Sequence, residues 1–584
     1  MRENGAVAGA ERMATTDKRP RERKRTNQFA VGESMTKDKD QDFCDLLRQY
    51  PRAIVHLRSQ VRKQRFGTIL GAGISVDFGA PQWNKLINDI AADPDVDAKD
   101  VADGGAFKGM AAPYQTEILY QKFRGTFFRN VSDLSPAEQQ NTATAAWLTI
   151  CQKYLYKTPP IDVAGELPKH PYMEALIPLI QNSALTVNFN FDDYLERALA
   201  ERKREKDKGN RGFEVVTDPW PQFRRQDCVI YHLHGYVPAG LMEKAVDRFV
   251  FSEASYSKQY VGARGHDTSF LLAHFARNTC LLVGCSLEAE LRNVLMRGAE
   301  TNPGNFHYYC HWMPTKETLS DIERQLISET NFKVYNLVTL FLTSLEVGLL
   351  LKLINRDEIS DGRLRDLAAR TSTPLKYTFY MTGSIGVGKS TTTSHLRNLN
   401  VLDEWLEPRP EILSIPWDKL TDEERNSADN WIACQFTLKN DTLRHDENAV
   451  ISVVDRPPLD PLVFTPKDKQ SDKAKFLADH LCPGGGYGIE EGVVILLLGD
   501  PKELSARVRA TGRQEYTATK LEAMQTDMRV LYESMPGTIT IDTQFVGIAE
   551  LTKRVAEVIH RQDYVPADLT KKLQSFIGVS SASV

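Results

Sequence analysis

The sequence predicts an α/β protein with two doubly wound parallel-sheet domains after a disordered N-terminal tail. Short apolar runs typical of buried strands alternate with helical patterns over residues 46–355, and a second alternating region begins after a polar stretch at 356–375. Such alternation favours parallel sheets, because each parallel strand needs a crossover connection. Ligand sites are then expected at the carboxyl ends of the strands.

The composition fits a large folded protein without a bulk preference for nucleic acid. The chain has 584 residues, of which 73 are Lys or Arg and 77 are Asp or Glu, so its formal charge is −4. This near-balance argues against coating of DNA or of a membrane surface through bulk electrostatics. The 41% of apolar residues suffices for large cores and excludes a wholly disordered protein.

Neither a membrane span nor a secretory signal is predicted. The longest apolar stretch, 337–353, is interrupted by Glu346 and Lys352 and predicts a buried helix rather than a span of about 20 residues. The N-terminus lacks the apolar segment of a signal peptide. The 8 cysteines are scattered and form no C-x-x-C pair, so we expect free thiols in a reduced, cytoplasmic setting.

Residues 1–45 form the predicted tail, which is rich in charge and poor in large apolar groups. Its segment 18–25 (KRPRERKR) is almost entirely basic. Such a run could bind nucleic acid or act as a targeting signal, but a solvated leader is the simpler interpretation.

The expected strands divide between the two domains. In the first domain, 46–355, they lie at 67–71, 184–189, 228–232, 280–284 and 307–311. A linker is expected at 356–375. In the second domain, 376–584, the expected strands lie at 377–382, 449–454 and 492–498.

The clearest motif follows the strand at 377–382 and precedes a helical pattern. Residues 383–391 (GSIGVGKST) match G-x-x-x-x-G-K-[ST] in full. Glycines let the backbone wrap the phosphates of ATP, while successive N–H groups supply positive potential. We expect Lys389 to reach the β- and γ-phosphates and Ser390 to bind Mg²⁺. The expected phosphate-binding residues are Gly383, Gly386, Gly388, Lys389, Ser390 and Thr391.

Several motifs after this loop resemble those of the deoxynucleoside kinases and their thymidylate kinase relatives. They are a Leu-Glu-Pro at 406–408, the helical segment WIACQ at 431–435, the Asp-Arg pair at 455–456 and the arginine-rich segment ARVRATGRQE at 506–515. The stretch DRPPLDP departs from the family, which usually has Ser after the Arg.

The resemblance implies roles for individual residues. Glu407 would be the base at the sugar hydroxyl, and Gln435 would read the edge of the nucleobase. Asp455 and Arg456 would lie near the hydroxyl and the phosphates. A lid over the transferring phosphoryl group would be formed by Arg507, Arg509 and Arg513. Phosphoryl transfer depends mainly on positioning and on neutralised oxygens, which bidentate arginines supply.

Five motifs of the first domain resemble, in order and spacing, the sirtuin-like domains of bacterial anti-phage NAD hydrolases. They are GAGIS at 71–75 with VDFGAPQW after it, NFNFDDYLE at 188–196, HLHG at 232–235, FVFSEASY at 249–256 and LVGCS at 282–286. The resemblance implies NAD as the ligand, with NADP as an open alternative.

In that family the turn after the first strand cradles the dinucleotide phosphates, a role that falls here on Gly71, Ala72, Gly73 and Ser75. Asn190 with Asp192 would contact the nicotinamide ribose and position the attacking group. His234 would be the general base or would orient the ribose. The loop with Gly284 and Ser286 would hold the adenosine side.

The chemistry suits these residue types. Cleavage of the nicotinamide–ribose bond passes through an oxocarbenium-like state and needs neutral polar groups, a base and a dry pocket. The histidine side chain, with an ordinary pKa near 6.5, suits the base, whereas Asn190 can orient water without adding charge. We expect His232 to be a structural histidine.

Two absences argue against a protein deacylase. Protein-deacylating sirtuins carry a four-cysteine zinc module, and this chain has no paired cysteines to build one. The GAPQW stretch also lacks the Asp-Phe-Arg that follows the corresponding proline in deacylases. A further departure is Ala289, where many relatives have Asp, although Glu288 and Glu290 flank it.

These observations leave four alternative functions for the whole chain. The first is an anti-phage NAD hydrolase that a nucleotide-binding second domain gates, with a phage-derived trigger and, as in related hydrolases, a homo-oligomeric assembly. The second is a nucleoside or nucleotide kinase that uses ATP and Mg²⁺ and carries an NAD or ADP-ribose sensor. A non-catalytic binding module is the third, and a protein deacylase is the fourth.

Overall fold

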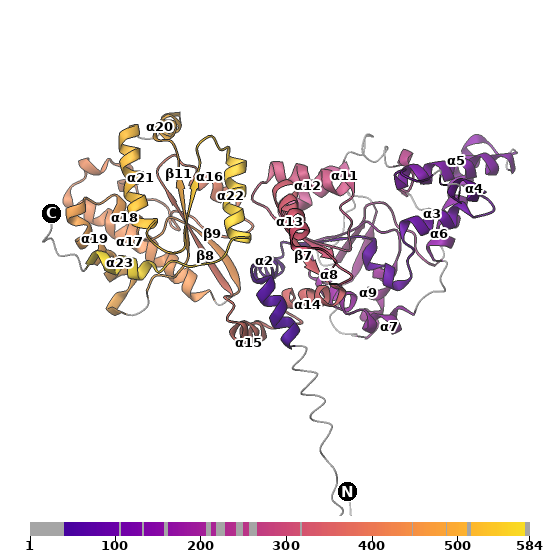
Figure 1. Cartoon of the computed structure of the whole chain (residues 1–584), viewed down its shortest axis with the longest axis horizontal. Coiled ribbons are helices and arrows are strands. Elements are labelled where there is room, and N and C mark those ends of the chain that lie inside the picture. Colours follow the sequence, from indigo (N-terminus) through magenta and orange to yellow (C-terminus); the bar gives the residue numbers. More distant parts are fainter. Residues whose placement is uncertain are drawn as a thin grey trace, which may run out of the picture.

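The computed structural model contains two parallel sheets, each covered by helices on both faces, which confirms the predicted fold class (Figure 1). The structure describes residues 40–103, 105, 107–130, 133–156, 162–205, 212–217, 228–240, 249–255, 266–315, 318–446, 448–485, 488–510 and 516–577. The predicted tail up to residue 39 and Arg513 lie outside the described residues.

The first sheet has seven strands in the order β3-β4-β2-β1-β5-β6-β7. Every pairing between these neighbours is parallel. Strands β2, β3 and β4 therefore lie on one side of β1, and the chain then returns to its other side with β5. The strands are β1 (Phe66–Leu70), β2 (Thr186–Asn188), β3 (Phe213–Val216), β4 (Cys228–His232), β5 (Thr279–Val283), β6 (His307–Trp312) and β7 (Leu337–Leu342).

Helices cover both faces of this sheet because its strands are apolar on both sides. One face packs against α2 (Pro51–Arg62), α8 (Pro171–Gln181), α9 (Tyr194–Glu205), α14 (Ser344–Ile354) and α15 (Asp361–Thr371). The opposite face packs against α11 (His266–Arg277) and α12 (Ala289–Thr301). Helix α13 (Asp321–Tyr335) precedes β7, and the short α7 (Val163–Glu166) precedes α8.

A helical module projects from the first sheet between β1 and β2 (Figure 1). It has its own aromatic core, centred on Trp147 and Phe123, which also receives Phe191 and Phe251 from loops at the edge of the sheet. The module consists of α3 (Trp83–Ala91), α4 (Lys99–Asp103), α5 (Ala112–Asn130) and α6 (Pro136–Leu155).

The second sheet has five parallel strands in the order β12-β11-β8-β10-β9. Strand β8 occupies the centre, so the loop that follows it lies in the middle of the carboxyl edge. The strands are β8 (Lys376–Gly383), β9 (Asn400–Leu402), β10 (Val450–Asp455), β11 (Val493–Leu498) and β12 (Thr538–Asp542).

Alternate residues of these strands enter two separate cores. One core contains Tyr380 and side chains of α17 (Asp422–His445), α19 (Gln470–Leu481), α21 (Ala518–Tyr532) and α23 (Leu569–Ile577). The other core contains Phe379 and side chains of α20 (Pro501–Ala510) and α22 (Ile548–His560). Helix α16 (Lys389–His395) follows the central strand, and α18 (Asp460–Val463) follows β10.

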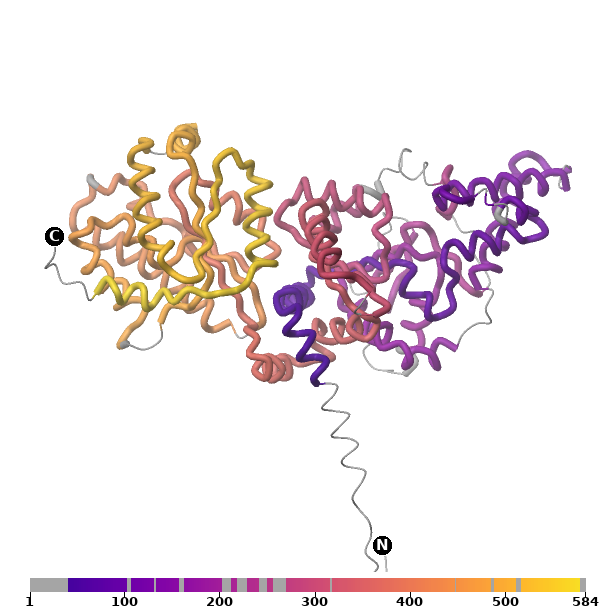
Figure 2. Tube along the Cα trace, viewed as in Figure 1, coloured from indigo at the N-terminus to yellow at the C-terminus, as the bar shows by residue number. Residues whose placement is uncertain are grey.

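Helix α2 lies between the two sheets and joins them (Figure 2). Its Val55 enters a core of the second sheet together with Phe306 and Phe332 from the first half of the chain. Arg52 donates a hydrogen bond to the main-chain oxygen of Ile559 at 2.8 Å and so satisfies the last turn of α22. The two halves therefore share a buried apolar junction.

Three segments differ from the sequence-based expectation. The stretch 337–353, expected to be one helix, contains β7 and then α14, because Thr343 and Glu346 form a capping box that starts a new helix. Helix α15 lies inside the expected linker, and residues 40–49, which include part of the expected tail, are helical. Asp40 pairs with Arg370 of α15 at 2.9 Å.

All eight cysteines are free thiols, and six of them are buried. No helix within the described ranges is long and apolar enough to cross a bilayer.

Candidate functional site

Two glycine-rich loops meet at the carboxyl edge of the first sheet, where the strand order reverses at β1. The N–H of Gly71 donates to Val283 at 3.1 Å, and the N–H of Gly73 donates to Gly284 at 2.9 Å. A Cβ atom at Gly71 would lie 2.5 Å from the carbonyl oxygen of Gly284, so only glycine allows this approach. Ligands of open α/β sheets bind at such a crevice.

Asn190, Ser75 and Asp192 form one buried hydrogen-bond network beside these loops. The side-chain amide of Asn190 donates to the carbonyl oxygen of Gly71 at 3.1 Å and to Ser75 Oγ at 3.2 Å. The hydroxyl of Ser75 in turn donates to Asp192 Oδ1 at 2.8 Å. Three residues that the sequence predicted from two separate motifs thus lie together.

Burial changes the pKa of the Asp192 carboxylate. Desolvation raises the pKa of Asp192 to about 6, although the hydrogen bond from Ser75 opposes this change. A carboxyl group that titrates near neutrality beside polar side chains is a common property of functional sites.

His234 is oriented by a carboxylate that the sequence analysis noted without a role. Its Nε2 lies 2.8 Å from Glu290 Oε2, and Glu290 belongs to the first turn of α12. The ring of His234 packs edge-on against Phe189 and lies 6.1 Å from the ring of Phe191, the neighbour of Asn190. A histidine held by a carboxylate can accept a proton in a fixed orientation.

The loop after β5 and the turn after β1 each expose one of the predicted contact residues. Ser286 is exposed, and its hydroxyl donates to Glu288 Oε1 at 3.1 Å. Ala72 is exposed as well, whereas Ser75 is buried. The predicted contacts of Ser286 and Ala72 with a dinucleotide remain predictions.

The loop after β8 has the backbone that its motif requires. Gly383, Gly386 and Gly388 have φ values of 148°, 84° and 105°, which side chains rarely adopt. Lys389 starts α16 and donates from Nζ to the carbonyl oxygen of Gly383 at 2.6 Å. Burial lowers the pKa of Lys389 to about 8.

Ser390 and Asp455 offer oxygen ligands beside this loop. Ser390 Oγ donates to Asp455 Oδ2 at 3.4 Å. Within the described part of the chain, the buried Asp455 Oδ1 has no hydrogen-bond partner. The Ser390 hydroxyl and the Asp455 carboxylate, with its orphaned Oδ1, fit a Mg²⁺ ion, which prefers such ligands together with phosphate oxygens.

Three residues that the sequence analysis did not select complete this cluster. Glu404 pairs with Arg456 at 2.9 Å, and the buried Lys439 donates to the main-chain oxygen of Asp455 at 2.7 Å. Asp460 accepts hydrogen bonds from Thr382 and Tyr532. Arg456 also has a φ of 69°, which is rare for a residue with a side chain and is typical of functional positions.

Glu407 and Gln435, both predicted site residues, bind each other. Gln435 is fully buried and donates from Nε2 to Glu407 Oε2 at 2.7 Å. Its Oε1 accepts the main-chain N–H groups of Leu406 and Glu407 at 2.9 and 3.2 Å. Gln435 therefore holds the turn that carries Glu407, and its contact with a nucleobase remains a prediction.

Helix α20, which carries Arg507 and Arg509 of the predicted lid, packs against the loop after β8. A Cβ atom at Gly386 would lie 2.8 Å from Val508. Arg507 pairs with Glu503 one turn earlier on the same helix, and Arg509 is exposed. Arg513 lies outside the described residues, so the lid stays a prediction.

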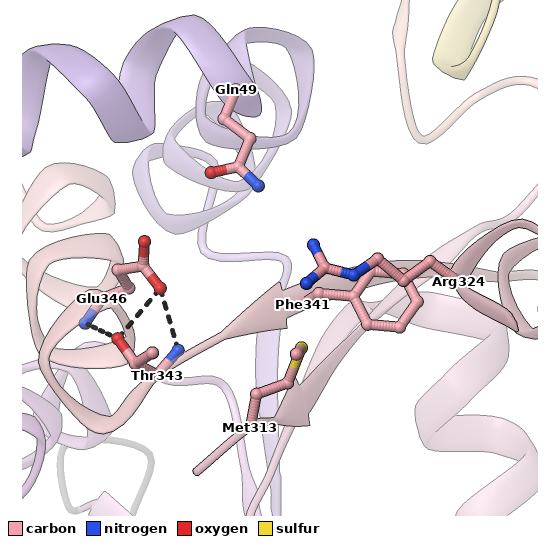
Figure 3. Close-up of a pocket in the computed structure, with 6 residues that line it drawn as sticks. All are labelled: Gln49, Met313, Arg324, Phe341, Thr343 and Glu346. Carbon is pink, nitrogen blue, oxygen red and sulfur yellow. Dashed lines mark hydrogen bonds between the residues drawn. The ribbon is translucent and has the colours of Figure 1, made fainter. Parts of the chain in front are cut away.

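A small pocket lies apart from both clusters, between the helix at 40–49 and the ends of β6 and β7 (Figure 3). The guanidinium group of Arg324 lies 5.8 Å from the centre of the Phe341 ring. Glu346 is engaged in the capping box with Thr343. The pocket is lined by Gln49, Met313, Arg324, Phe341, Thr343 and Glu346.

Residues 184–335 match the family model of the SIR2-like domain. This range includes Asn190, His234, Gly284 and Glu290. No curated protein matches the chain.

Solved structures resemble about a third of the chain. A thymidylate kinase from Candida albicans is 12% identical, with 33% of this chain and 98% of that chain covered and a TM-score of 0.25. A deoxyadenosine kinase from M. mycoides with bound dATP is 15% identical, with 31% and 94% covered and a TM-score of 0.24. The Deinococcus radiodurans tunicamycin resistance protein is 16% identical, with 33% and 99% covered and a TM-score of 0.22.

Proposed function

We propose that the first half of the chain hydrolyses NAD to nicotinamide and ADP-ribose, and that nucleotide binding in the second half gates this reaction. One observation carries the proposal: Asn190, Ser75 and Asp192 form a single hydrogen-bond network on the glycine turn after β1. The match of residues 184–335 to the SIR2-like domain supports an NAD-related activity.

The proposed chemistry uses groups that are already oriented. Water adds to the anomeric carbon of the nicotinamide ribose as the bond to nicotinamide breaks, and one proton is released. The amide of Asn190 orients the water or a ribose hydroxyl without adding charge. His234, held by Glu290 at 2.8 Å, takes the proton, directly or through a ribose hydroxyl.

Gating is supported by a contact between the two halves that connects α16 with the end of α12. Lys389 and Ser390 lie at the start of α16, and this helix ends at His395 against Gly304 of the first half. Gly304 follows α12, which carries Glu290 in its first turn. A nucleotide that shifts α16 would therefore press on the helix that orients His234.

Gln60 provides a second contact along the same route. Its amide donates to the main-chain oxygen of Asn398, just after α16, at 2.6 Å. Because α2 lies in the apolar junction of both halves, a shift of this segment would reach both sheets.

Anti-phage defence is the proposed biological role. Depletion of NAD would halt an infected cell, and phage replication alters the nucleotide pools that a kinase-like domain could sense. A phage-derived trigger and a homo-oligomeric assembly belong to this proposal. Cells that carry the wild-type chain should lose NAD during infection, whereas cells that carry Asn190→Ala should not.

The gate is tested with purified full-length chains and chromatography of nicotinamide and ADP-ribose. Wild type and Lys389→Ala are compared with and without ATP, Mg²⁺ and each deoxynucleoside. We expect Lys389→Ala to abolish the nucleotide dependence of NAD hydrolysis. Equal rates and an equal nucleotide response in both chains would contradict the gate.

A second candidate function is a nucleoside or nucleotide kinase whose first half senses NAD or ADP-ribose. The pair of Glu404 and Arg456, close to Lys389 and Asp455, favours it because it offers a base and a cation beside the phosphate loop. Transfer of radiolabelled phosphate from ATP to a deoxynucleoside, without loss of NAD, would support this function over the first.

A further inference from the structure

His232 lies behind the proposed catalytic network and uses both of its ring nitrogens. It is the last residue of β4 and is fully buried. Its Nδ1 lies 2.8 Å from the main-chain oxygen of Asn190, and its Nε2 lies 2.8 Å from Glu196 Oε1. Glu196, in the first turn of α9, is buried as well.

The partners of the two nitrogens indicate a charged ring. A carbonyl oxygen only accepts hydrogen bonds, and an ionised carboxylate also only accepts. With Glu196 ionised, both nitrogens of His232 donate, and the side chain is an imidazolium. Burial lowers the pKa of His232, but the charge of Glu196 and the two hydrogen bonds outweigh burial and raise it overall.

Two further groups face this ring. The carboxylate of Asp192 contributes a favourable charge, and the ring of Tyr236 packs edge-on with a centroid distance of 4.8 Å. In the described residues, Glu196 Oε2 has no hydrogen-bond partner, so His232 is the contact that orients this carboxylate.

Asn190 is held by hydrogen bonds of its N–H, its carbonyl oxygen and its side-chain amide. Its N–H donates to Asn188 Oδ1 at 3.1 Å, and its carbonyl oxygen accepts from His232. Its side-chain amide donates to Gly71 and Ser75. Removal of the bond from His232 would free the peptide between Asn190 and the following residue, and the amide would lose its fixed direction.

We propose that His232 and Glu196 form a positioning pair for Asn190, in which the imidazolium fixes the Asn190 carbonyl and Glu196 keeps the imidazolium in place. This inference rests on the proposed NAD hydrolysis. A buried ion pair is a weak source of stability, because desolvation offsets the attraction between its charges. We expect the pair to contribute to NAD hydrolysis by holding Asn190 in a fixed orientation rather than by stabilising the fold.

Two matched substitutions separate positioning from general stability. The amide nitrogen of asparagine lies near the position of histidine Nδ1, and that of glutamine lies near the position of Nε2. His232→Asn therefore keeps the donor to Asn190, whereas His232→Gln keeps the donor toward Glu196. Both are made together with Glu196→Gln, so that neither chain buries an unpaired carboxylate.

NAD turnover of the two double variants is the first readout. We expect kcat of the His232→Gln double variant to be at least about tenfold below that of the His232→Asn double variant, with similar KM, because misoriented catalytic groups lose rate rather than binding. Equal kcat values would overturn the proposal. Wild type and Asn190→Ala are measured in parallel.

Hydrogen exchange gives a readout that does not depend on NAD hydrolysis. Peptides that cover residues 188–194 should exchange faster in the His232→Gln double variant than in the His232→Asn double variant and the wild type. Equal exchange in the two double variants would overturn the positioning role. If wild type consumes ATP but no NAD in every nucleotide condition, the proposed function fails, and the exchange result alone decides whether the pair holds Asn190.

Discussion

Gly304 of the first half lies directly against the main-chain carbonyl of His395 in the second half, where an added Cβ atom would be 2.1 Å from the carbonyl oxygen. His395 ends the helix that starts with the phosphate-loop residue Lys389. Gly304 follows the helix whose first turn holds Glu290 against His234. This contact links the two helices that carry the proposed sites.

A single methyl group at this contact should disturb the gate. Gly304→Ala forces the backbone of one half to shift, and such overpacking costs about 1–3 kcal/mol of the free energy of unfolding. We expect the response of NAD hydrolysis to ATP or deoxynucleosides to change severalfold, while catalysis at saturating NAD persists. Rates with and without nucleotide are measured by nicotinamide release.

Gly298→Ala is the matched control, because an added Cβ at this position of α12 meets no atom within 4 Å. It should leave the nucleotide response intact and stabilise the helix by about 0.5–1 kcal/mol. An unchanged nucleotide response in Gly304→Ala would show that the contact transmits nothing.

Asp192→Asn should make the protein more stable and less active. Burial raises the pKa of Asp192 from 3.8 to about 6. The folded state therefore binds more protons than the unfolded state between these two values, so stability falls as the pH rises through this window and stays reduced above it. At pH 7.5 the substitution should add up to about 3 kcal/mol to the free energy of unfolding.

Urea unfolding at about pH 7.5 and about pH 4.5 tests this prediction, since the gain should shrink at the lower pH where Asp192 takes up its proton. NAD hydrolysis should fall at least about tenfold, because the neutral side chain no longer polarises Ser75 and Asn190. A variant that is less stable than wild type at the higher pH would contradict the account.

Substitutions of Glu404 and of Glu407 are predicted to lower phosphoryl transfer to different extents. Glu404→Gln removes the charge that pairs with Arg456 and should lower any phosphoryl transfer at least about a hundredfold. Glu407→Gln alters a side chain that Gln435 already holds and should have a smaller effect. Transfer from labelled ATP to deoxynucleosides is the measurement. A more severe loss in Glu407→Gln than in Glu404→Gln would indicate that Glu407 is the base, as the resemblance to the deoxynucleoside kinases implies.

Nucleotide affinity should weaken in alkaline solution. Burial lowers the pKa values of Lys389 and Lys439 to about 8, so both lose their positive charge as the pH rises through that value. Calorimetric titration with ATP and Mg²⁺ should therefore show weaker binding at about pH 9 than at about pH 7. Adenosine, which lacks phosphates, is the control ligand and should bind equally at both; a pH-independent affinity for ATP would contradict a role of these charges.

Much of the fold could be predicted because buried parallel strands leave apolar runs in the sequence. Each of the eight runs expected as strands overlaps a strand of the structure. The strands that were not predicted are not marked by a distinct apolar run. Strand β3 (FEVV) has four residues and β9 has three. Strand β7 (LVTLFL) merges with the apolar helix that follows Thr343, and β12 (TITID) alternates with polar residues.

The residues that complete the two sites were less accessible from the sequence. Asn190, Ser75 and Asp192 follow strands, so their meeting at one edge of the sheet is a consequence of the fold. Glu196 and Glu290 belong to ordinary polar helix patterns, and their histidine partners lie 36 and 56 residues away in the chain. Their contribution depends on helix placement, which residue patterns do not specify.

The central claim is tested most directly by the decay of NAD with purified full-length protein, wild type beside Asn190→Ala and His234→Ala, with and without ATP and a panel of deoxynucleosides. The account predicts that wild type releases nicotinamide and ADP-ribose in at least one nucleotide condition. Both variants should be slower by a factor of about a hundred or more. Intact NAD with wild type in every condition while ATP is consumed, or equal NAD loss in all three chains, would contradict it.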